Sequence, residues 1–275
     1  MKSHIFTYLV LLALGVMGVA THVRAEGAGS NTVTISVSVF TAPPDVGSLH
    51  VTLMPARAVA DGAMWRRVGT TPWLADGYTE TSIITGTYTL EFKKITGWIT
   101  PVTQEVVIYK DLTKNATGTY VIVTCTLTYN AGGGGTISGA TPQTVDYGGS
   151  GTPVTAMPDT GYHFVQWSDG TLTATRTDTN VTTDTTVTAT FSINTYTLTY
   201  TAGAHGSISG ISPQTVNYGG SGTAVTAVPD KNYRFAKWSD GLTANPRTDA
   251  NVTADISVTA TFAIVTQCES SWMLY

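Results

Sequence analysis

Much of this 275-residue chain alternates between apolar and polar positions, which is the two-residue period of a half-buried β-strand. Residues 48–54, for example, place Leu49, Val51 and Leu53 on one face. The same alternation occurs in residues 32–39 and 86–92, and the apolar-rich runs 104–109 and 119–123 complete a set of at least five. These five runs predict a small antiparallel β-sandwich over residues 31–124. Residues 55–85 lack the period and are expected to form an irregular insertion between two of its strands.

From residue 125 onward, one pattern of strands and turns occurs twice. Residues 125–193 and 196–264 align without a gap, and 44 of the 69 aligned positions are identical. Each copy contains short alternating runs separated by glycines or ended by a proline, residues that commonly interrupt strands. In the first copy the predicted strands are residues 126–129, 136–138, 154–158, 162–167 and 185–191. Helical periodicity is scarce, so the fold class predicted for the chain is mainly β.

The same alternation predicts side-chain directions within the strand 162–167. It places Tyr162, Phe164 and Gln166 on one face, and Val165 and Trp167 on the other. The two copies are joined only by residues 194 and 195. Because this connector is too short to act as a free linker, the two modules are expected to touch.

The order of landmarks within each copy resembles a known family. In the first copy the landmarks are Tyr147-Gly148, Pro158, the run 161–167 with sequence GYHFVQW, and the closing run 181–191. In the second copy they recur as Tyr218-Gly219, Pro229, the run 233–238 and the closing run 252–262. This order resembles the divergent internalin-type B-repeat family over nearly all of both copies. The resemblance implies small modules with a β-grasp-like sheet, strung along bacterial surface and secreted proteins.

Two features depart from that family pattern. Asn232 stands in the second copy where the first has Gly161, and both copies carry a Gly-rich insertion, near Gly132 and Gly203. These departures leave the number of strands in each module open.

The first unit resembles a different group of domains. Its strand Gly86-Thr87-Tyr88 follows the run GSLHVTLMP and precedes the turn around Trp98. This pattern is similar to the PEGA-type and carboxypeptidase-regulatory-like β-sandwich domains of bacterial surface proteins, over about 75 residues. The Pro-Glu-Gly-Ala tetrapeptide that names the first group is absent.

The N-terminus has the features of an export signal. Lys2 supplies a positive start, residues 5–20 are mostly apolar, and Val23-Arg24-Ala25 offers small residues at a cleavage site. A second cut is available at Gly18-Val19-Ala20. An uncleaved membrane anchor is the competing interpretation, but the apolar run is shorter than the ~20 residues that span a bilayer. Residues 1–25 are therefore predicted to be a signal peptide, and the mature chain to be extracellular or at the cell surface.

Charge and composition exclude some classes of partner. Removing residues 1–25 takes away Lys2 and Arg24, and changes the formal charge from −4 to about −6. An acidic chain is a poor ligand for nucleic acid or for an anionic membrane. We therefore expect no nucleic-acid partner and no membrane insertion after signal cleavage, and a surface glycan or a protein as the partner.

The two cysteines, Cys125 and Cys268, are not expected to form a disulfide. They lie a domain length or more apart in a linear arrangement of modules. Tyr196 occupies the position of Cys125 in the second copy, so the module does not require a thiol there. Two isolated cysteines are also no metal site.

A search for catalytic motifs yields none, so we predict no enzyme, no cofactor and no metal. His50, His163 and His205 are expected at the surface, because the two copies do not share a histidine. The Trp-Ser-Asp-Gly and Arg-Thr-Asp motifs do recur in both copies, at 167–170 and 176–178 and again at 238–241 and 247–249. A ligand site is one interpretation of them. The favoured one is a packed Trp, an Asp-Gly turn and an Arg paired with an acid.

Carboxylates near the closing strand are candidate calcium ligands. Asp178, Asn180 and Asp184 recur as Asp249, Asn251 and Asp255. Hard oxygen ligands suit this ion, but the spacing is not that of an EF-hand. Asx turns are the favoured explanation.

Trp65, Trp73 and Trp98 are the candidate ligand-binding residues. An exposed aromatic ring in the first unit would stack on a sugar, whereas a small sandwich also needs large side chains in its core. The sequence therefore predicts a non-catalytic, exported bacterial repeat protein with a structural or adhesive role. The alternative is a carbohydrate-binding accessory protein that uses these rings. The expected organisation is a signal peptide (1–25), a β-sandwich (31–124), two modules (125–193 and 196–264) and a tail (265–275).

Overall fold

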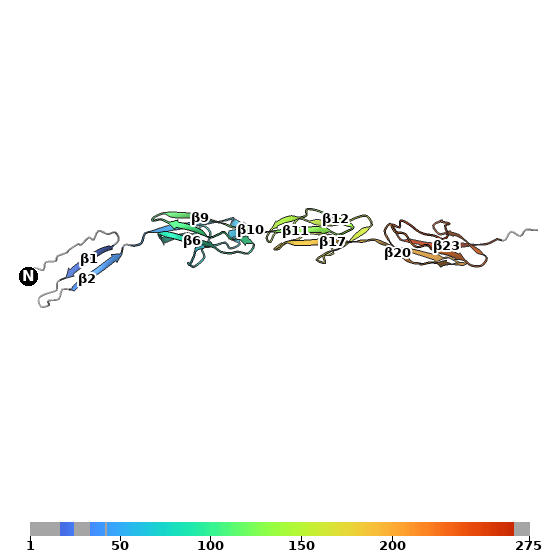
Figure 1. The fold of residues 1–275 in the computed structure, drawn as a ribbon, viewed down its shortest axis with the longest axis horizontal. Coiled ribbons are helices and arrows are strands. Elements are labelled where there is room, and N and C mark those ends of the chain that lie inside the picture. Colours follow the sequence, from blue (N-terminus) through green and yellow to red (C-terminus); the bar gives the residue numbers. More distant parts are fainter. Residues whose placement is uncertain (1–16, 25–33, 42, 267–275) are drawn as a thin grey trace, which may run out of the picture. The chain divides into compact units, whose positions relative to one another are not determined.

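The computed structural model describes residues 17–24, 34–41 and 43–266, and the chain is mainly β (Figure 1). It divides into two compact units, residues 1–123 and 124–275. The predicted signal peptide and tail lie largely outside the described residues. Within the former, β1 (Met17–Arg24) pairs antiparallel with β2 (Thr34–Thr41).

The first unit contains a small sandwich of two three-stranded sheets. One sheet has the order β5-β3-β9 and the other β4-β6-β8. The elements are β3 (Val46–Met54), α1 (Ala56–Ala60), β4 (Trp65–Arg67), β5 (Thr79–Ile84), β6 (Gly86–Phe92), β7 (Trp98–Ile99), β8 (Gln104–Ile108), β9 (Thr113–Thr119) and β10 (Val121–Ile122). The mainly β fold class is confirmed. The sandwich is not wholly antiparallel as predicted, because β3 pairs in parallel with β9, a strand that the predicted runs did not include. Two further details of the predicted sandwich are also wrong.

The first wrong detail is the role of the strand predicted at 32–39. A strand is present there as β2, but its partner is β1 and it joins neither sandwich sheet. The second is the insertion 55–85. It contains α1, β4 and β5, and it places the Trp65 side chain, which is fully buried, in the core. Alternation could not reveal Trp65, because β4 is only three residues long and too short to show a period.

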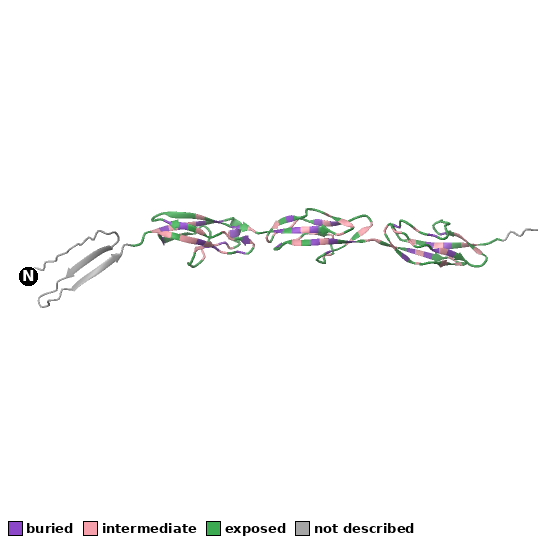
Figure 2. Ribbon diagram, viewed as in Figure 1, coloured by how far each residue is buried: buried purple, intermediate pink, exposed green. Residues whose placement is uncertain are grey.

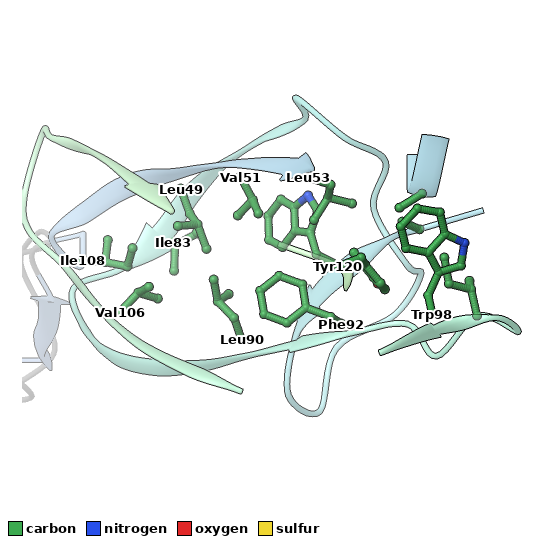
Figure 3. Close-up of a cluster of buried hydrophobic side chains, with 14 residues drawn as sticks. Leu49, Val51, Leu53, Ile83, Leu90, Phe92, Trp98, Val106, Ile108 and Tyr120 are labelled. Atoms are coloured by element: carbon green, nitrogen blue, oxygen red, sulfur yellow. The ribbon is translucent and has the colours of Figure 1, made fainter. Parts of the chain in front are cut away.

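The core of the sandwich lies between its two sheets (Figure 3). Leu49, Val51 and Leu53 of β3 point inward as predicted, and are almost inaccessible to solvent. They face residues of β6 and β8, among them Leu90 and Ile108. Buried and exposed residues alternate along these strands, which is why the period in the sequence was visible (Figure 2).

Each repeat is built around a mixed four-stranded sheet. In the first repeat the strands are β11 (Thr124–Ala131), β12 (Gly135–Ser138), β13 (Gln143–Asp146), β14 (Val154–Pro158), β15 (Tyr162–Trp167), β16 (Thr175–Arg176) and β17 (Thr185–Ile193). The sheet order is β13-β11-β17-β15, with β11 and β17 parallel at its centre. A second sheet, β12-β14-β16, packs its own apolar residues on the same core.

The second repeat has the same architecture. Its strands are β18 (Thr195–Ala202), β19 (Gly206–Ser209), β20 (Gln214–Asn217), β21 (Thr226–Pro229), β22 (Tyr233–Trp238) and β23 (Ile256–Ile264). The main sheet has the order β20-β18-β23-β22, and the smaller sheet is the pair β19-β21. Pro246 stands where the first repeat has Thr175 in β16. A proline has no N–H to donate to a ladder, and Asn245 binds the backbone of Ala227 instead.

One prediction about side-chain direction was wrong for a local reason. The register of β15 shifts between Phe164 and Gln166, which is a β-bulge. The extra residue brings Trp167 onto the same side as Phe164, where their ring centroids are 6.0 Å apart, and leaves Gln166 exposed. The same bulge occurs in β22. Bulges break the two-residue period, so strict alternation assigns the tryptophan to the wrong face.

The two repeats touch, as their short connector predicted. The Asn194 N–H donates to the Gly161 carbonyl at 2.8 Å, and the Tyr218 N–H of the second repeat donates to the Asn194 carbonyl at 2.8 Å. Gly161 has a φ of +83°, and a Cβ at this position would lie 2.3 Å from the Tyr218 ring. Glycine thus allows both the left-handed turn and the close approach of the next module.

Replacing Trp65 with alanine should destabilise the first unit by about 3–5 kcal/mol, because it removes the largest fully buried side chain of that core. Trp73→Ala is the matched control, since Trp73 is only partly buried and should cost much less. Urea unfolding of the full chain, read by peptide-resolved hydrogen exchange, measures both variants. Equal losses for the two, or a loss located in the repeats, would contradict this placement of the core.

Candidate functional site

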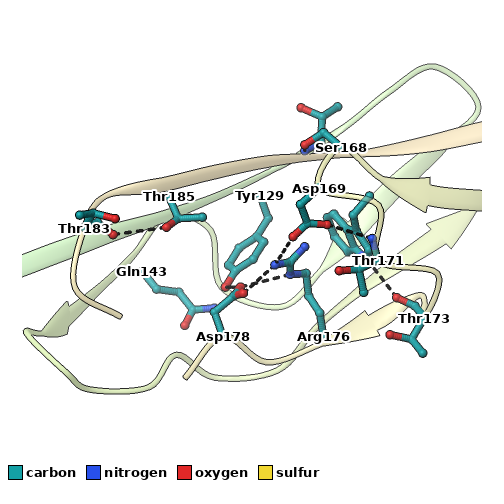
Figure 4. A network of polar contacts seen from close by, with 12 residues as sticks. Tyr129, Gln143, Ser168, Asp169, Thr171, Thr173, Arg176, Asp178, Thr183 and Thr185 are labelled. Carbon is teal, nitrogen blue, oxygen red and sulfur yellow. Dashed lines mark hydrogen bonds and ion pairs between the residues drawn. The ribbon is translucent and has the colours of Figure 1, made fainter. Parts of the chain in front are cut away.

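The recurring Trp, Arg and Asp motifs come together in one cluster per repeat. In the first repeat, the Arg176 side chain is 8% exposed, and its Nη2 lies 2.6 Å from Asp178 Oδ1 and 2.9 Å from Asp169 Oδ2 (Figure 4). The Tyr129 hydroxyl donates to Asp178 Oδ2 at 2.6 Å. A buried guanidinium is therefore held between two carboxylates, and one of these is also bound by a phenol from β11.

The tryptophan forms the apolar side of this cluster. The Arg176 Cζ lies 5.1 Å from the Trp167 ring centroid, within the range of a cation–π contact. Trp167 is fully buried, and its indole N–H donates to the Thr173 carbonyl at 3.0 Å. Tyr129 contacts the same ring edge-on, at 6.1 Å between centroids. The favoured interpretation, a packed Trp with a paired Arg, is confirmed.

The second repeat reproduces the cluster with nearly the same distances. The Arg247 side chain is 3% exposed, its Nη2 lies 2.7 Å from Asp249 Oδ1, and its Nη1 lies 2.8 Å from Asp240 Oδ2. The Tyr200 hydroxyl donates to Asp249 Oδ2 at 2.7 Å. The Arg247 Cζ lies 5.4 Å from the Trp238 ring centroid. The sequence motifs did not indicate a role for the two tyrosines, although each lies on a predicted strand and is identical in both copies.

The close charges displace the pKa values of the acidic groups. Burial alone would raise the pKa of Asp178, but the hydrogen bonds from Arg176 and Tyr129 and the guanidinium charge outweigh it, so this pKa is lowered. For Asp249 the hydrogen bond from Arg247 is the largest influence, and the pKa is again lowered. Burial, followed by the bond to a carboxylate, raises the pKa of the Tyr129 and Tyr200 hydroxyls. Both carboxylates are therefore ionised at neutral pH and both phenols keep their protons.

This arrangement is suited to fastening the module together. It ties the turn after β15 and the segment before β17 to β11 through a buried guanidinium, although the Asp169 side chain at that turn is 39% exposed. The carboxylate oxygens of Asp178 accept hydrogen bonds from Arg176 and Tyr129, so few of their lone pairs are available to a ligand. A tightly paired charge cluster with no free nucleophile or base has the composition of a structural site.

A family model described as a divergent InlB B-repeat domain matches residues 125–195 and again residues 196–266. These matches cover more than half of the chain. The chain belongs to the divergent InlB B-repeat family. The resemblance noted in the sequence is thereby confirmed for both copies, and the two modules are B-repeats.

A solved structure is similar to this chain in fold. The solved structure titled "The Bacillus anthracis TIE protein" matches with a TM-score of 0.51 at 11% sequence identity, over 90% of this chain and 58% of that one. At so low an identity the match concerns the fold alone, and this chain spans less than two thirds of that structure. No curated protein matches the sequence.

The three candidate tryptophans outside the B-repeats differ in exposure. Trp65 is fully buried, with its indole N–H donating to the Ala75 carbonyl at 3.0 Å. Trp98 is 7% exposed and donates to Asp61 Oδ2 at 3.0 Å. Neither ring presents an open face to a sugar. Trp73 is partly exposed, and the Arg66 guanidinium lies 4.2 Å from its ring centroid. A role in sugar stacking thus rests on Trp73.

The other candidate residues are dispersed. His163 and His205 are exposed as expected, whereas His50 is partly buried and its Nδ1 lies 2.9 Å from Thr79 Oγ1. Asp184 accepts a bond from the Thr126 N–H, and Asp178 is held by Arg176. Over residues 17–24, 34–41 and 43–266, no three His, Cys, Asp or Glu side chains gather as metal ligands would.

Cys125 is buried as a free thiol in the first B-repeat core, and Cys268 lies outside the described residues. No helix in the described part of the chain has the length and apolar character needed to cross a bilayer.

Removing the buried guanidinium should destabilise one B-repeat selectively. Arg247→Ala leaves Asp249 buried without its cation, and should cost the second repeat about 3–5 kcal/mol. Arg176→Ala should do the same to the first repeat only. Hydrogen exchange of β18 and β23 against β11 and β17, measured on each full-length variant, separates the two effects. Unchanged protection in the altered repeat would show that the cluster does not hold the module.

Acid should weaken both B-repeats through the same clusters. The pKa values of Asp178 and Asp249 are lower in the folded than in the unfolded chain, so the unfolded chain binds protons first as the pH falls. Their contribution to stability is complete above the unfolded pKa of about 3.9, and is lost as the pH falls through the lower folded value. Urea midpoints measured from about pH 5 to about pH 2 should therefore decline. Asp249→Asn should flatten this decline for the second repeat, while Asp230→Asn, at an exposed turn of the same repeat, should leave it unchanged.

Proposed function

We propose that this chain is an exported, non-catalytic protein of the bacterial surface or its surroundings, with a structural or adhesive role. The observation that carries the proposal is the pair of buried clusters. In both B-repeats the recurring Arg, Asp, Tyr and Trp side chains bind one another, so they stabilise the module and leave no reactive group presented. Membership of a repeat family that is generally non-catalytic supports the same role.

Export and adhesion are tested together on the full chain. The chain is expressed in a bacterium with and without residues 1–25, and an antibody locates it in cytoplasm, surface and medium. Purified protein is then incubated with intact cells. Export that requires residues 1–25, followed by retention on cells, is the expected result. A cytoplasmic chain would contradict the export proposal, and export without retention would leave a structural spacer and exclude adhesion to those cells.

A second candidate function is glycan binding through the first unit. It is favoured by Trp73, whose ring is partly exposed and is stacked by Arg66, since an aromatic ring beside a cation suits a sugar with polar substituents. On a glycan array, Trp73→Ala should weaken binding roughly tenfold, the equivalent of about 1.4 kcal/mol. Thr71→Ala, an exposed change in the same loop, is the control and should bind normally. Absence of binding by the unaltered chain would exclude this candidate.

A further inference from the structure

The sandwich and both B-repeats share one topological feature: the first and last long strands are hydrogen-bonded neighbours and run parallel. In the sandwich, β3 pairs with β9 from Ser48↔Thr113 to Met54↔Thr119. In the first B-repeat, β11 pairs with β17 from Leu127↔Thr185 to Ala131↔Ala189. In the second, β18 pairs with β23 from Leu198↔Ile256 to Ala202↔Ala260. Two unrelated sequence patterns thus reach the same arrangement of terminal strands.

This arrangement determines how a pulling force reaches each domain. When two terminal strands are parallel, the chain enters at one end of the pair and leaves at the opposite end. Tension along the chain therefore tries to slide one strand past the other along its length. All the bonds between the strands share the load, and they must fail nearly together. In an antiparallel terminal pair the two ends are adjacent, and the bonds would open one after another.

Further hydrogen bonds donated by backbone N–H groups lengthen each parallel pair at both ends. In the first B-repeat, Thr126 N–H donates to Asp184 Oδ1 at 2.7 Å before the ladder, and Gly132 N–H donates to the Ala189 carbonyl at 2.8 Å after it. The second repeat has the equivalent bonds to Asp255 Oδ1 and the Ala260 carbonyl, at 2.8 and 2.9 Å. In the sandwich, Ser48 N–H donates to the Leu112 carbonyl and Tyr120 N–H to the Met54 carbonyl. Asp184 and Asp255, which the sequence singled out as possible calcium ligands, thus act in this ladder.

The core resists the same sliding motion. The inward side chains of the parallel pair are buried, among them Leu127, Tyr129 and Ala189 in the first B-repeat. Tyr129 is also bound to Asp178 of the charge cluster. Displacing β11 relative to β17 therefore breaks the ladder, the apolar contacts and the Tyr–Asp bond in one step. Only Asn194 lies between β17 and β18, so tension passes almost directly from one clamp to the next.

We propose that the chain is a load-bearing tether, in which each parallel terminal pair is a shear clamp against force applied through the chain ends. This inference rests on the proposed structural role. It specifies that role as resistance to a pulling force. It does not depend on which surface or glycan the chain binds.

Single-molecule pulling of the full chain from its two ends tests the proposal. Unfolding of each B-repeat should appear as a separate high-force event that releases up to ~250 Å of chain, for 71 residues at about 3.5 Å each. Extension without such events would overturn the proposal.

A second pulling geometry isolates the contribution of the clamp. Thr195 and Asn217 are exposed partners at one end of the antiparallel pair β18–β20. Handles attached to the variant Thr195→Cys/Asn217→Cys, with Cys268→Ser, should open this pair bond by bond, at a clearly lower force. The urea midpoint of this variant serves as the control and should equal that of the unaltered chain. An unchanged midpoint would show that the lower force comes from the pulling direction and not from lost stability, since forced unfolding is governed by the unfolding rate. Equal forces in both geometries would overturn the shear clamp.

The outcome can be separated from that of the proposed function. A chain that binds no cell or glycan but ruptures at high force would keep the tether and lose adhesion. A chain that is retained on cells but extends at low force would keep adhesion and lose the tether.

Discussion

The structure of each B-repeat depends on a buried arginine that is neutralised inside the module. A module of about 70 residues has little apolar volume, and burying a guanidinium in it is unfavourable unless acids compensate the charge. Two aspartates supply that compensation, while a tyrosine and a tryptophan cover the guanidinium. The cluster links a turn, a loop and a central strand, and so helps to fix how the two sheets pack together.

The alternating pattern was a reliable guide where strands were regular. Predicted strands such as 154–158 and 162–167 coincide with β14 and β15, and the inward residues of β3 were correct. The duplication made the B-repeats easy to recognise, because two copies show which positions vary. Much of the fold was therefore accessible from the sequence alone.

The remaining features depend on local or long-range contacts that no period encodes. A bulge moves Trp167 to the core face, and only the pairing with β17 reveals it. Trp65 lies in a segment without alternation, yet packs between sheets that are formed by distant residues. The clusters were predicted in part: the Arg–Asp pairing followed from the motif, whereas Tyr129 and Tyr200 reach it across 49 residues. Trp65, Trp73 and Trp98 were equal candidates in the sequence, and only their packing in the fold distinguishes them.

The glycine at the contact between the B-repeats means that the two copies are not interchangeable, despite their 44 identical positions. Gly161 admits the ring of Tyr218 at a distance that a Cβ would forbid, and the matching position in the second copy is Asn232. If the order of the copies were exchanged, the asparagine would meet the corresponding ring, that of Tyr147. The order of the two modules therefore depends on the side chain at this one position. A gene rearrangement that permuted the modules would yield two well-folded domains with a poorly fitting joint.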